Sequence, residues 1–238
     1  MGDRQVTAVV GVGPGLGAAV GRRFARAGHD VALLARSEDR LNAIREDIVR
    51  DGGTAVVAPC DTTEPTSIGA AFERVREALG PPDVLVYNAG AFRMATLLET
   101  DPDTFEASWR ANCLGGFLAM REAVPAMVER GRGTVLLTGA TASIRGSARF
   151  SCLAVGKFGL RALAQSAARE LGPKGVHVAH VLVDGQIDTP RVREMLPDRE
   201  AHTFLQPDAI AETYWQLHRQ DRTAWTLEMD LRPAVERF

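Results

Sequence analysis

The sequence predicts a single α/β domain, residues 1–238, in which helices cover both faces of a doubly wound, parallel, seven-stranded sheet. Short runs of apolar and β-branched residues alternate along the chain with longer amphipathic segments, a pattern typical of repeated strand–helix–strand units. The apolar runs are continuous, as expected for strands that are buried on both faces. A chain of 238 residues is long enough for one large domain, and no segment has the composition of a linker.

The expected elements follow one another in a regular order. The expected strands are Thr7–Val10, Val31–Ala35, Ala55–Ala58, Val84–Tyr87, Thr134–Thr138, Val176–Val183 and Trp225–Asp230. The expected helices are Gly15–Ala27, Asp39–Asp51, Thr66–Leu79, Asp103–Arg130, Phe150–Leu171 and Asp208–Gln220. Gly28 can end the first helix in a left-handed conformation, Gly80 and two prolines end the third, and Asp101 can cap the fourth. The charged segment 190–207 has weak periodicity and is expected to form a partly helical flap.

Composition limits the classes of partner. A formal net charge of −2 gives no electrostatic basis for binding nucleic acid or an anionic membrane surface. No apolar run reaches the roughly 18 residues that cross a bilayer, and the stretch Val6–Val10 is followed by glycines rather than by a signal-peptide cleavage site. Three widely spaced cysteines favour a reducing compartment over a disulfide framework or a zinc site. We therefore expect a cytoplasmic protein without a metal site.

A glycine-rich segment between the first strand and the first helix predicts a phosphate-binding loop. It reads Gly11-Val12-Gly13-Pro14-Gly15-Leu16-Gly17. Glycines at this spacing allow a tight turn that brings backbone N–H groups and the start of a helix against a pyrophosphate. Such a pattern alone also fits a purely structural turn. Its place between a strand and a helix favours nucleotide binding and a Rossmann-type fold.

The residue directly after the second expected strand indicates which nucleotide is bound. NAD-binding domains commonly have an acidic residue there, which binds the ribose 2′-hydroxyl, whereas this chain has Arg36. A guanidinium group matches the oxygens of a 2′-phosphate, so NADP(H) is favoured, with NAD(H) as the alternative. The structural interpretation is a solvated arginine at the start of a helix.

Further motifs, taken in order, resemble the short-chain dehydrogenase/reductase family. The glycine loop is similar to the family's GxxxGxG element, and Asp61-Thr62 to its acidic turn that contacts adenine. Asn88-Ala89-Gly90, after Tyr87, resembles the NNAG motif. Asp184-Gly185-Gln186-Ile187-Asp188-Thr189 resembles the PGxIxT turn, with Asp184 in place of proline. The similarity extends from about Val6 to Thr189.

The resemblance implies a set of residues for NADP(H) and two for catalysis. The implied cofactor residues are Gly11, Gly13, Pro14, Gly15, Leu16, Arg36, Asp61, Thr62, Asn88, Ala89, Gly90, Lys157, Gly185, Ile187 and Thr189. Lys157 fits the lysine of the family's YxxxK motif, and Asn112 fits its helix-embedded asparagine. In the family the lysine binds the nicotinamide ribose and lowers the pKa of the tyrosine, while the asparagine supports a water relay.

The catalytic pattern departs from the family's at two positions. Leu153 stands four residues before Lys157, where the family has tyrosine, and Ala140 stands at the serine position. Leucine cannot donate a proton, and alanine cannot hydrogen-bond an oxygen. Thr141 is the best remaining hydroxyl, so Thr141, Asn112 and Lys157 are the candidate catalytic residues. A turn or packing role for Thr141, and a helix-supporting role for Asn112, are the alternatives.

Three functions remain open on these residues. The first is an atypical NADP-dependent oxidoreductase that acts on a small organic molecule. Because a positioned general acid contributes roughly 10²–10⁴ in rate, its acceptor would be one that needs no protein acid, such as an iminium or a quinone-like compound. The second is a non-catalytic NADP-binding protein, and the third is an isomerase or lyase that uses the same pocket.

The two longest expected helices bear on oligomer formation, and the flap bears on substrate access. Helices Asp103–Arg130 and Phe150–Leu171 carry apolar and small residues suited to burial. The resemblance implies that they pack across a two-fold axis in a homodimer or homotetramer. Segment 190–207 is expected to form the substrate lid.

Overall fold

A seven-stranded sheet forms the centre of the protein, whose computed structural model describes residues 4–236. The strand order is β3-β2-β1-β4-β5-β6-β7, and every neighbouring pair is parallel. The strands are β1 (Val6–Val10), β2 (Asp30–Ala35), β3 (Thr54–Pro59), β4 (Val84–Tyr87), β5 (Gly133–Ala140), β6 (Val176–Val183) and β7 (Glu228–Leu231). The order reverses between β1 and β4, the place where open α/β sheets bind ligands at the carboxyl ends of their strands.

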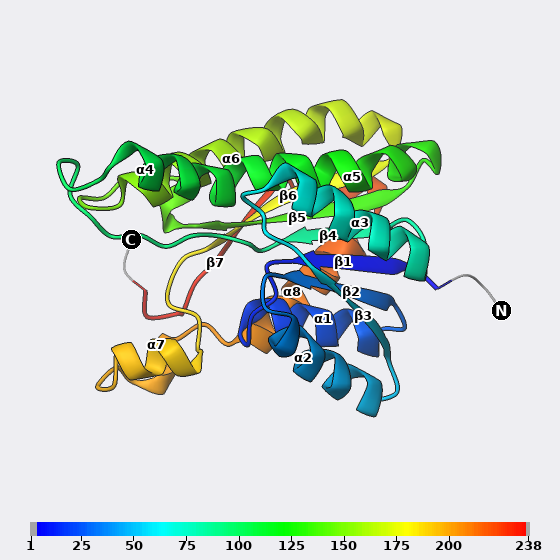
Figure 1. The fold of residues 1–238 in the computed structure, drawn as a ribbon, viewed down its shortest axis with the longest axis horizontal. Helices are drawn as coiled ribbons and strands as arrows, with labels where there is room; N and C mark the ends of the chain where they lie inside the picture. Colours follow the sequence, from blue (N-terminus) through cyan, green and yellow to red (C-terminus); the bar gives the residue numbers. More distant parts are fainter. Residues whose placement is uncertain (1–3, 237–238) are drawn as a thin grey trace.

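Helices cover both faces of the sheet (Figure 1). One face carries α1 (Leu16–Arg26), α2 (Glu38–Arg50) and α8 (Pro207–His218). The other carries α3 (Pro65–Leu79), α4 (Pro102–Trp109), α5 (Gly115–Glu129) and α6 (Ser151–Leu171). The short helix α7 (Pro190–Met195) and the loop before α4 project from the same end of the molecule. The prediction of a doubly wound seven-stranded α/β fold is confirmed.

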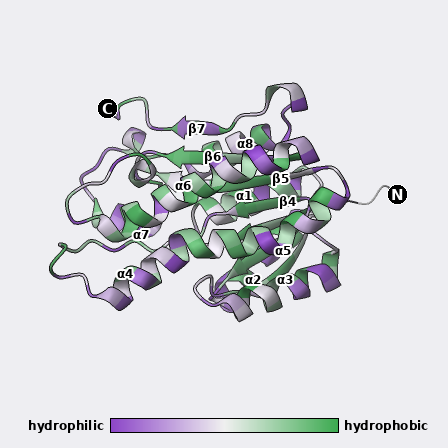
Figure 2. Cartoon of the chain, turned by 90° about the horizontal axis from the view of Figure 1, so that it is seen from above, coloured by the Kyte–Doolittle hydropathy of each residue, from purple (hydrophilic) through white to green (hydrophobic). Residues whose placement is uncertain are grey.

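Hydrophobic side chains fill two cores, one on each face of the sheet. Every residue of β6 is buried, which is why its apolar run does not alternate with polar residues. The edge strand β7 is the least hydrophobic strand (Figure 2) and is only partly buried. A short, charged edge strand discourages pairing with a second sheet.

The local signals at the helix ends act as predicted. Asp101 caps α4, with its carboxylate accepting a hydrogen bond from the N–H of Thr104 at 2.8 Å. Gly28 and Gly80 both have φ of +92°, a conformation that residues with a side chain rarely adopt. The flap 190–207 is partly helical, since it contains α7 and the 3-10 turn Ala201–Thr203.

Two elements differ from the prediction by more than two residues, whereas the other boundaries agree within two. The last strand begins at Glu228 rather than at Trp225, because the Trp225 ring stacks on His177 at 4.9 Å and its indole N–H donates to the carbonyl of Gln220. The single helix expected over Asp103–Arg130 is divided into α4, a π-helical segment Arg110–Leu114, and α5. The division coincides with Asn112, whose Nδ2 donates at 2.9 Å to the carbonyl of Ser108 and so occupies a group that a regular helix would use itself.

Candidate functional site

A cavity of about 680 Å³ lies at the carboxyl ends of the strands, around the point where the strand order reverses. The loops that follow β1, β2, β3 and β4 all contribute to its wall. Of the residues predicted to bind the nucleotide, the following line it: Gly11, Gly13, Arg36, Asp61, Thr62, Asn88, Ala89 and Gly90. The sequence therefore located one wall of a single cavity from four separate motifs.

The glycine loop packs closely against its neighbours on two sides. Gly11 has φ of +90°, and a Cβ there would overlap the backbone of Ala89. A Cβ on Gly15 would lie 2.6 Å from Cγ2 of Thr189, so the turn 184–189 lies against the loop. A Cβ on Gly13, by contrast, would meet no atom within 4 Å, which leaves open space beside this residue. This cradle fits a pyrophosphate group.

Asn88 connects the loops that follow β1 and β4. Its Nδ2 donates at 3.0 Å to the carbonyl of Gly11, and its backbone N–H donates at 2.8 Å to the carbonyl of Val10. The side chain therefore fixes the glycine loop relative to the neighbouring strand.

Two arginines and an aspartate lie at the end of the cavity formed by β2 and β3. Arg36 is exposed and lines the cavity, and Arg40, one helical turn further along, lines it too. The N–H of Thr63, with smaller contributions from the Thr63 hydroxyl and from Arg36, holds the pKa of Asp61 below its ordinary value. Sequence reasoning missed Arg40, although its i+4 spacing from Arg36 at the start of a helix was a usable signal.

Some predicted cofactor residues lie outside the wall of this cavity. They are Pro14, Gly15, Leu16, Lys157, Gly185, Ile187 and Thr189. Pro14 is exposed and Leu16 is buried at the start of α1. Gly185, with φ of +147°, and Ile187 belong to the turn whose end, Thr189, contacts Gly15. The turn 185–189 therefore lies beside the glycine loop rather than in the cavity wall, and Lys157 lies behind Gly90.

Lys157 and Asn112 come together over Gly90. The buried ammonium of Lys157 donates to the carbonyl of Thr138 at 2.8 Å, and burial lowers the pKa of Lys157 to about 8. Asn112 is fully buried, and its Nδ2 also donates to the carbonyl of Ala91 at 2.9 Å, while its Oδ1 has no hydrogen-bond partner among residues 4–236. A Cβ on Gly90 would lie 2.9 Å from this Oδ1 and 3.5 Å from Nζ of Lys157. An acceptor and a donor thus face the same space beside the cavity wall.

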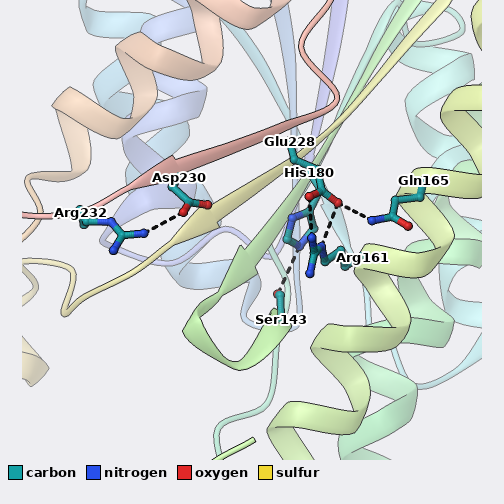
Figure 3. A network of polar contacts seen from close by, with 7 residues as sticks. All are labelled: Ser143, Arg161, Gln165, His180, Glu228, Asp230 and Arg232. Carbon is teal, nitrogen blue, oxygen red and sulfur yellow. Dashed lines mark hydrogen bonds and ion pairs between the residues drawn. The ribbon is translucent and has the colours of Figure 1, made fainter. Parts of the chain in front are cut away.

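Thr141, the third candidate catalytic residue, is bound to a carboxylate. Its hydroxyl donates to Oδ1 of Asp184, and Oδ2 of Asp184 lies 3.4 Å from Nη1 of Arg232. Arg232 also binds Asp230 at 2.7 Å (Figure 3). Because Ala140, Val183 and Leu231 are paired across β5, β6 and β7, the residues that follow them lie side by side. The only signal for the Thr141–Asp184 contact in these segments was the unusual aspartate in the turn.

A buried polar network supports the turn after β5 from behind (Figure 3). Oγ of Ser143 accepts a hydrogen bond from the N–H of Ala140 at 3.1 Å and lies 3.2 Å from Nε2 of His180. Burial lowers the pKa of His180 to about 4, so this imidazole is neutral at pH 7. Nearby, Glu228 accepts from Arg161 at 2.8 and 2.7 Å and from Gln165 at 2.6 Å. His180 is therefore a buried core residue.

Neither tyrosine of the chain reaches the positions of Leu153 and Ala140. The hydroxyl of Tyr87 donates to the carbonyl of Ala111 at 2.7 Å, and that of Tyr214 bonds Thr138 at 2.8 Å. Both tyrosines are fully buried, and burial raises the pKa of each hydroxyl. Leu153 itself is half-buried on α6, one turn before Lys157.

The part of the chain that the structure describes offers neither a metal-ligand cluster nor a membrane-spanning helix. Between residues 4 and 236, no three His, Cys, Asp or Glu side chains group as metal ligands would. None of the helices in this part of the chain is both long and apolar enough to cross a membrane.

Comparison with known proteins identifies the family. A family model described as short chain dehydrogenase matches residues 5–200. A short-chain dehydrogenase/reductase of Armillaria gallica is 33% identical over 189 residues, 78% of this chain and 72% of that protein. A solved short-chain dehydrogenase from Rhodopseudomonas palustris is 36% identical with a TM-score of 0.84, covering 96% of this chain and 98% of that one. A metagenomic short-chain oxidoreductase in complex with NADP is 30% identical with a TM-score of 0.84, covering 98% of each chain. The chain belongs to the short-chain dehydrogenase/reductase family.

Proposed function

We propose that this protein is an NADP(H)-dependent oxidoreductase that acts on a small organic molecule without a tyrosine acid. The observation that carries the proposal is the single cavity at the strand-order reversal, with the glycine loop at its centre and Arg36 and Arg40 at one end. A solved relative in complex with NADP supports the choice of nucleotide. The substitutions Leu153 and Ala140 support the absence of the usual acid and oxygen-binding serine.

The positions of the residues suggest how the nucleotide lies. The N–H groups of the glycine loop and the start of α1 would hold the pyrophosphate. Arg36 and Arg40 would bind the 2′-phosphate, and Asp61 and Thr62 would contact the adenine side. With the adenosine half held at the end of β2 and β3, residues at the carboxyl ends of β4, β5 and β6 would hold the nicotinamide half. There the ammonium of Lys157 can bind ribose hydroxyls, and Gly185, Ile187 and Thr189 can border the ring.

The chemistry available at that end is limited by its side chains. When bound, the nicotinamide ring donates or accepts a hydride. Lys157 and Asn112, which face the same space beside Gly90, would orient the ribose, and the apolar side chains of Leu153 and Ala140 offer no proton. Such a site suits acceptors whose reduction needs no protein acid, because a missing acid costs an unactivated ketone roughly 10²–10⁴ in rate.

Titration of the purified protein with NADPH and NADH tests this proposal. We expect NADPH to bind more tightly than NADH, and Arg36→Asp to weaken NADPH binding at least about tenfold through loss of the phosphate contact. Arg50→Asp, an exposed change at the far end of α2, is the matched control and should leave the affinity unchanged. Failure of both nucleotides to bind would contradict the proposal.

A non-catalytic NADP-binding protein is the second candidate, favoured by the same two substitutions at positions 140 and 153. It predicts tight NADPH binding that Lys157→Ala weakens, together with no change in nicotinamide absorbance across a broad set of acceptors. Turnover of any acceptor would exclude it.

We also propose that the protein forms a homodimer or homotetramer and that segment 190–207 closes over the substrate. Exposed aromatic side chains on α4, α5 and α6 support the first point; they are Phe105, Trp109, Phe117 and Phe158. Arg191, on α7, lines the cavity and supports the second. Light scattering after size-exclusion chromatography measures the assembly, and Trp109→Glu, a charge placed on this surface, should shift it towards the monomer. A mass equal to one chain for the unmodified protein would contradict an assembly.

A further inference from the structure

The row formed by Thr141, Asp184 and Arg232 lies where the reacting end of the nucleotide is proposed to be. These residues follow β5, β6 and β7 at the carboxyl edge of the sheet, on the side of β4 away from Arg36 and Asp61. The turn that begins at Asp184 contacts the glycine loop through Thr189 and Gly15. The row therefore borders the position of the substrate in the proposed function.

Hydrogen bonding within this row leaves acceptors but no free hydroxyl donor. Thr141 has one hydroxyl hydrogen, which it donates to Asp184. Its lone pairs and the carboxylate remain available, and a group that approaches them must itself donate a hydrogen bond or carry positive charge. The neighbouring positions, Ala140 and Leu153, add no donor. A carbonyl oxygen that gains negative charge during reduction therefore finds no hydroxyl donor at Thr141, whereas a cationic nitrogen finds the carboxylate of Asp184.

The charges of the row and its neighbours also favour binding of a cation. Two carboxylates, Asp184 and Asp230, share the guanidinium of Arg232, so these three groups together carry one negative charge. Lys157 is the nearby buried cation, and its ammonium is already bound to the carbonyl of Thr138. Glu228 and Arg161 neutralise each other. Asp184 is only 7% exposed, so its attraction for a cation is weakly screened by solvent.

Two arginines, Arg93 and Arg149, lie near carboxylates of their own. Arg149 lowers the pKa of Glu99, although the backbone of Thr96 contributes most to that shift. Arg93 acts in the same direction on the pKa of Asp101, where the N–H of Thr104 contributes most. The positive charges of these two arginines are therefore partly offset by the neighbouring carboxylates.

An exposed aromatic side chain also lines the cavity. Phe92 lines the cavity, is 64% exposed and meets the Phe150 ring edge-to-face at a centroid distance of 5.7 Å. An exposed aromatic face at a ligand site attracts an organic cation and packs against its apolar body.

We propose that the substrate is an organic cation with a carbon–nitrogen double bond, an iminium ion, and that Asp184 and Thr141 select it. This inference rests on the proposed function and names its substrate class. The hydride, with both its electrons, adds to the iminium carbon; the π pair of the C=N bond becomes the lone pair of nitrogen, and a neutral amine is formed. The positive charge passes to the oxidised nicotinamide. No proton is required from the protein, which agrees with Leu153 and Ala140.

Binding of a cation tests the inference without turnover. The ammonium form of N-methyl-tetrahydroisoquinoline and its neutral oxygen analogue isochroman are titrated calorimetrically into protein saturated with NADPH. We expect the ammonium to bind at least about tenfold more tightly than isochroman, and Asp184→Asn to remove that preference, since a nearby unit charge in a weakly screened site is worth about this much. Asp184→Asn keeps the shape of the side chain, and Asp47→Asn, a partly exposed aspartate on α2, is the matched control.

Turnover gives a second, independent readout. We expect N-methyl-dihydroisoquinolinium to be reduced in preference to the quinone menadione and the ketone acetophenone, and Thr141→Val to lower its kcat/KM while NADPH affinity stays constant. Thr141→Val also keeps the test decisive if Asp184→Asn fails to fold. Equal binding of ammonium and isochroman, or a preference for menadione, overturns the inference while NADPH binding stands. Loss of NADPH binding in the unmodified protein would overturn the proposed function itself.

Discussion

The ammonium of Lys157 donates a 2.8 Å hydrogen bond to the carbonyl of Thr138 from a fully enclosed position. Removal from water disfavours the charged form, and this lowers the pKa of the lysine to about 8. The positive charge of Lys157, which is proposed to bind ribose hydroxyls, is therefore lost close to physiological pH. An exposed lysine loses its charge at a pH more than two units higher.

NADPH affinity should consequently fall as the pH rises through about 8. The protonated lysine donates hydrogen bonds to the ribose, whereas the neutral amine formed at higher pH donates more weakly. Titrations between pH 6.5 and 9.5 measure the effect, which we expect to approach tenfold. Lys157→Ala should remove the pH dependence, and Lys174→Ala, at the only other lysine of the chain, should preserve it. A flat profile for the unmodified protein would refute the role of Lys157.

Gly13→Ala separates nucleotide binding from stability. The added Cβ would meet no atom of the protein within 4 Å and would stand in the space beside the glycine loop. We expect an unchanged Tm but NADPH binding weakened more than about tenfold, because the methyl group takes the place of a phosphate oxygen. Gly69→Ala, in α3, also meets open space and serves as control; it should raise stability by about 0.5–1 kcal/mol and leave binding unaltered. Normal NADPH affinity in Gly13→Ala would mean that the pyrophosphate lies elsewhere.

Acid should destabilise the fold through His180. Its pKa is lowered from 6.5 to about 4, chiefly by burial, so between these values the unfolded chain binds a proton that the folded chain does not. Stability is therefore complete above pH 6.5 and decreases as the pH falls towards 4, with His180 costing on the order of 2 kcal/mol by pH 5. Burial also lowers the pKa of His29, His177 and His218, which adds to the decrease.

Urea unfolding at pH 7 and pH 5 measures this loss. His180→Gln, which keeps a polar group beside Ser143, should reduce the difference between the two pH values, whereas His202→Gln, at an exposed histidine, should not. Equal stability at pH 7 and pH 5 in the unmodified protein would contradict the neutral, buried imidazole.

Restoring the family's acid should create ketone reduction. The double change Leu153→Tyr and Ala140→Ser places a hydroxyl one turn before Lys157 and another at the end of β5. We expect kcat/KM for acetophenone to rise by about 10²-fold or more, while reduction of an iminium ion changes little. Leu153→Phe with Ala140→Ser, which adds the ring without its hydroxyl, is the control. The same rise in this control would show that the ring, and not the proton donor, limits ketone reduction.

Much of the fold follows from patterns that depend only on nearby residues. The strands are recognisable because burial on both faces makes them continuously apolar, and β4 was predicted to the residue. The glycine loop was predictable because Gly11 needs a positive φ and a close approach to Ala89 that other residues do not allow.

Features that depend on partners distant in sequence were harder to predict. Trp225 has the composition of a strand residue, but its ring is held by His177, 48 positions earlier, and the strand starts later. The hydroxyl of Thr141 was predicted as a candidate from the sequence, but its hydrogen bond to Asp184 depends on how β5 and β6 are aligned. Arg40 was missed because exposed arginines are common, and its i+4 spacing from Arg36 was the one signal that could have identified it.

The π-helical segment Arg110–Leu114 acts as a permanent insertion of about one residue into an otherwise continuous helix. An extra residue rotates everything that follows by about 100° around the helix axis. The π-helical segment thus fixes the rotation of α5 relative to α4. One side of α4 can therefore border the cavity while a different side of α5 covers the sheet. Deleting one residue here would restore a regular helix, but it would turn Ala119, Met120 and Ala123 away from the core that they fill.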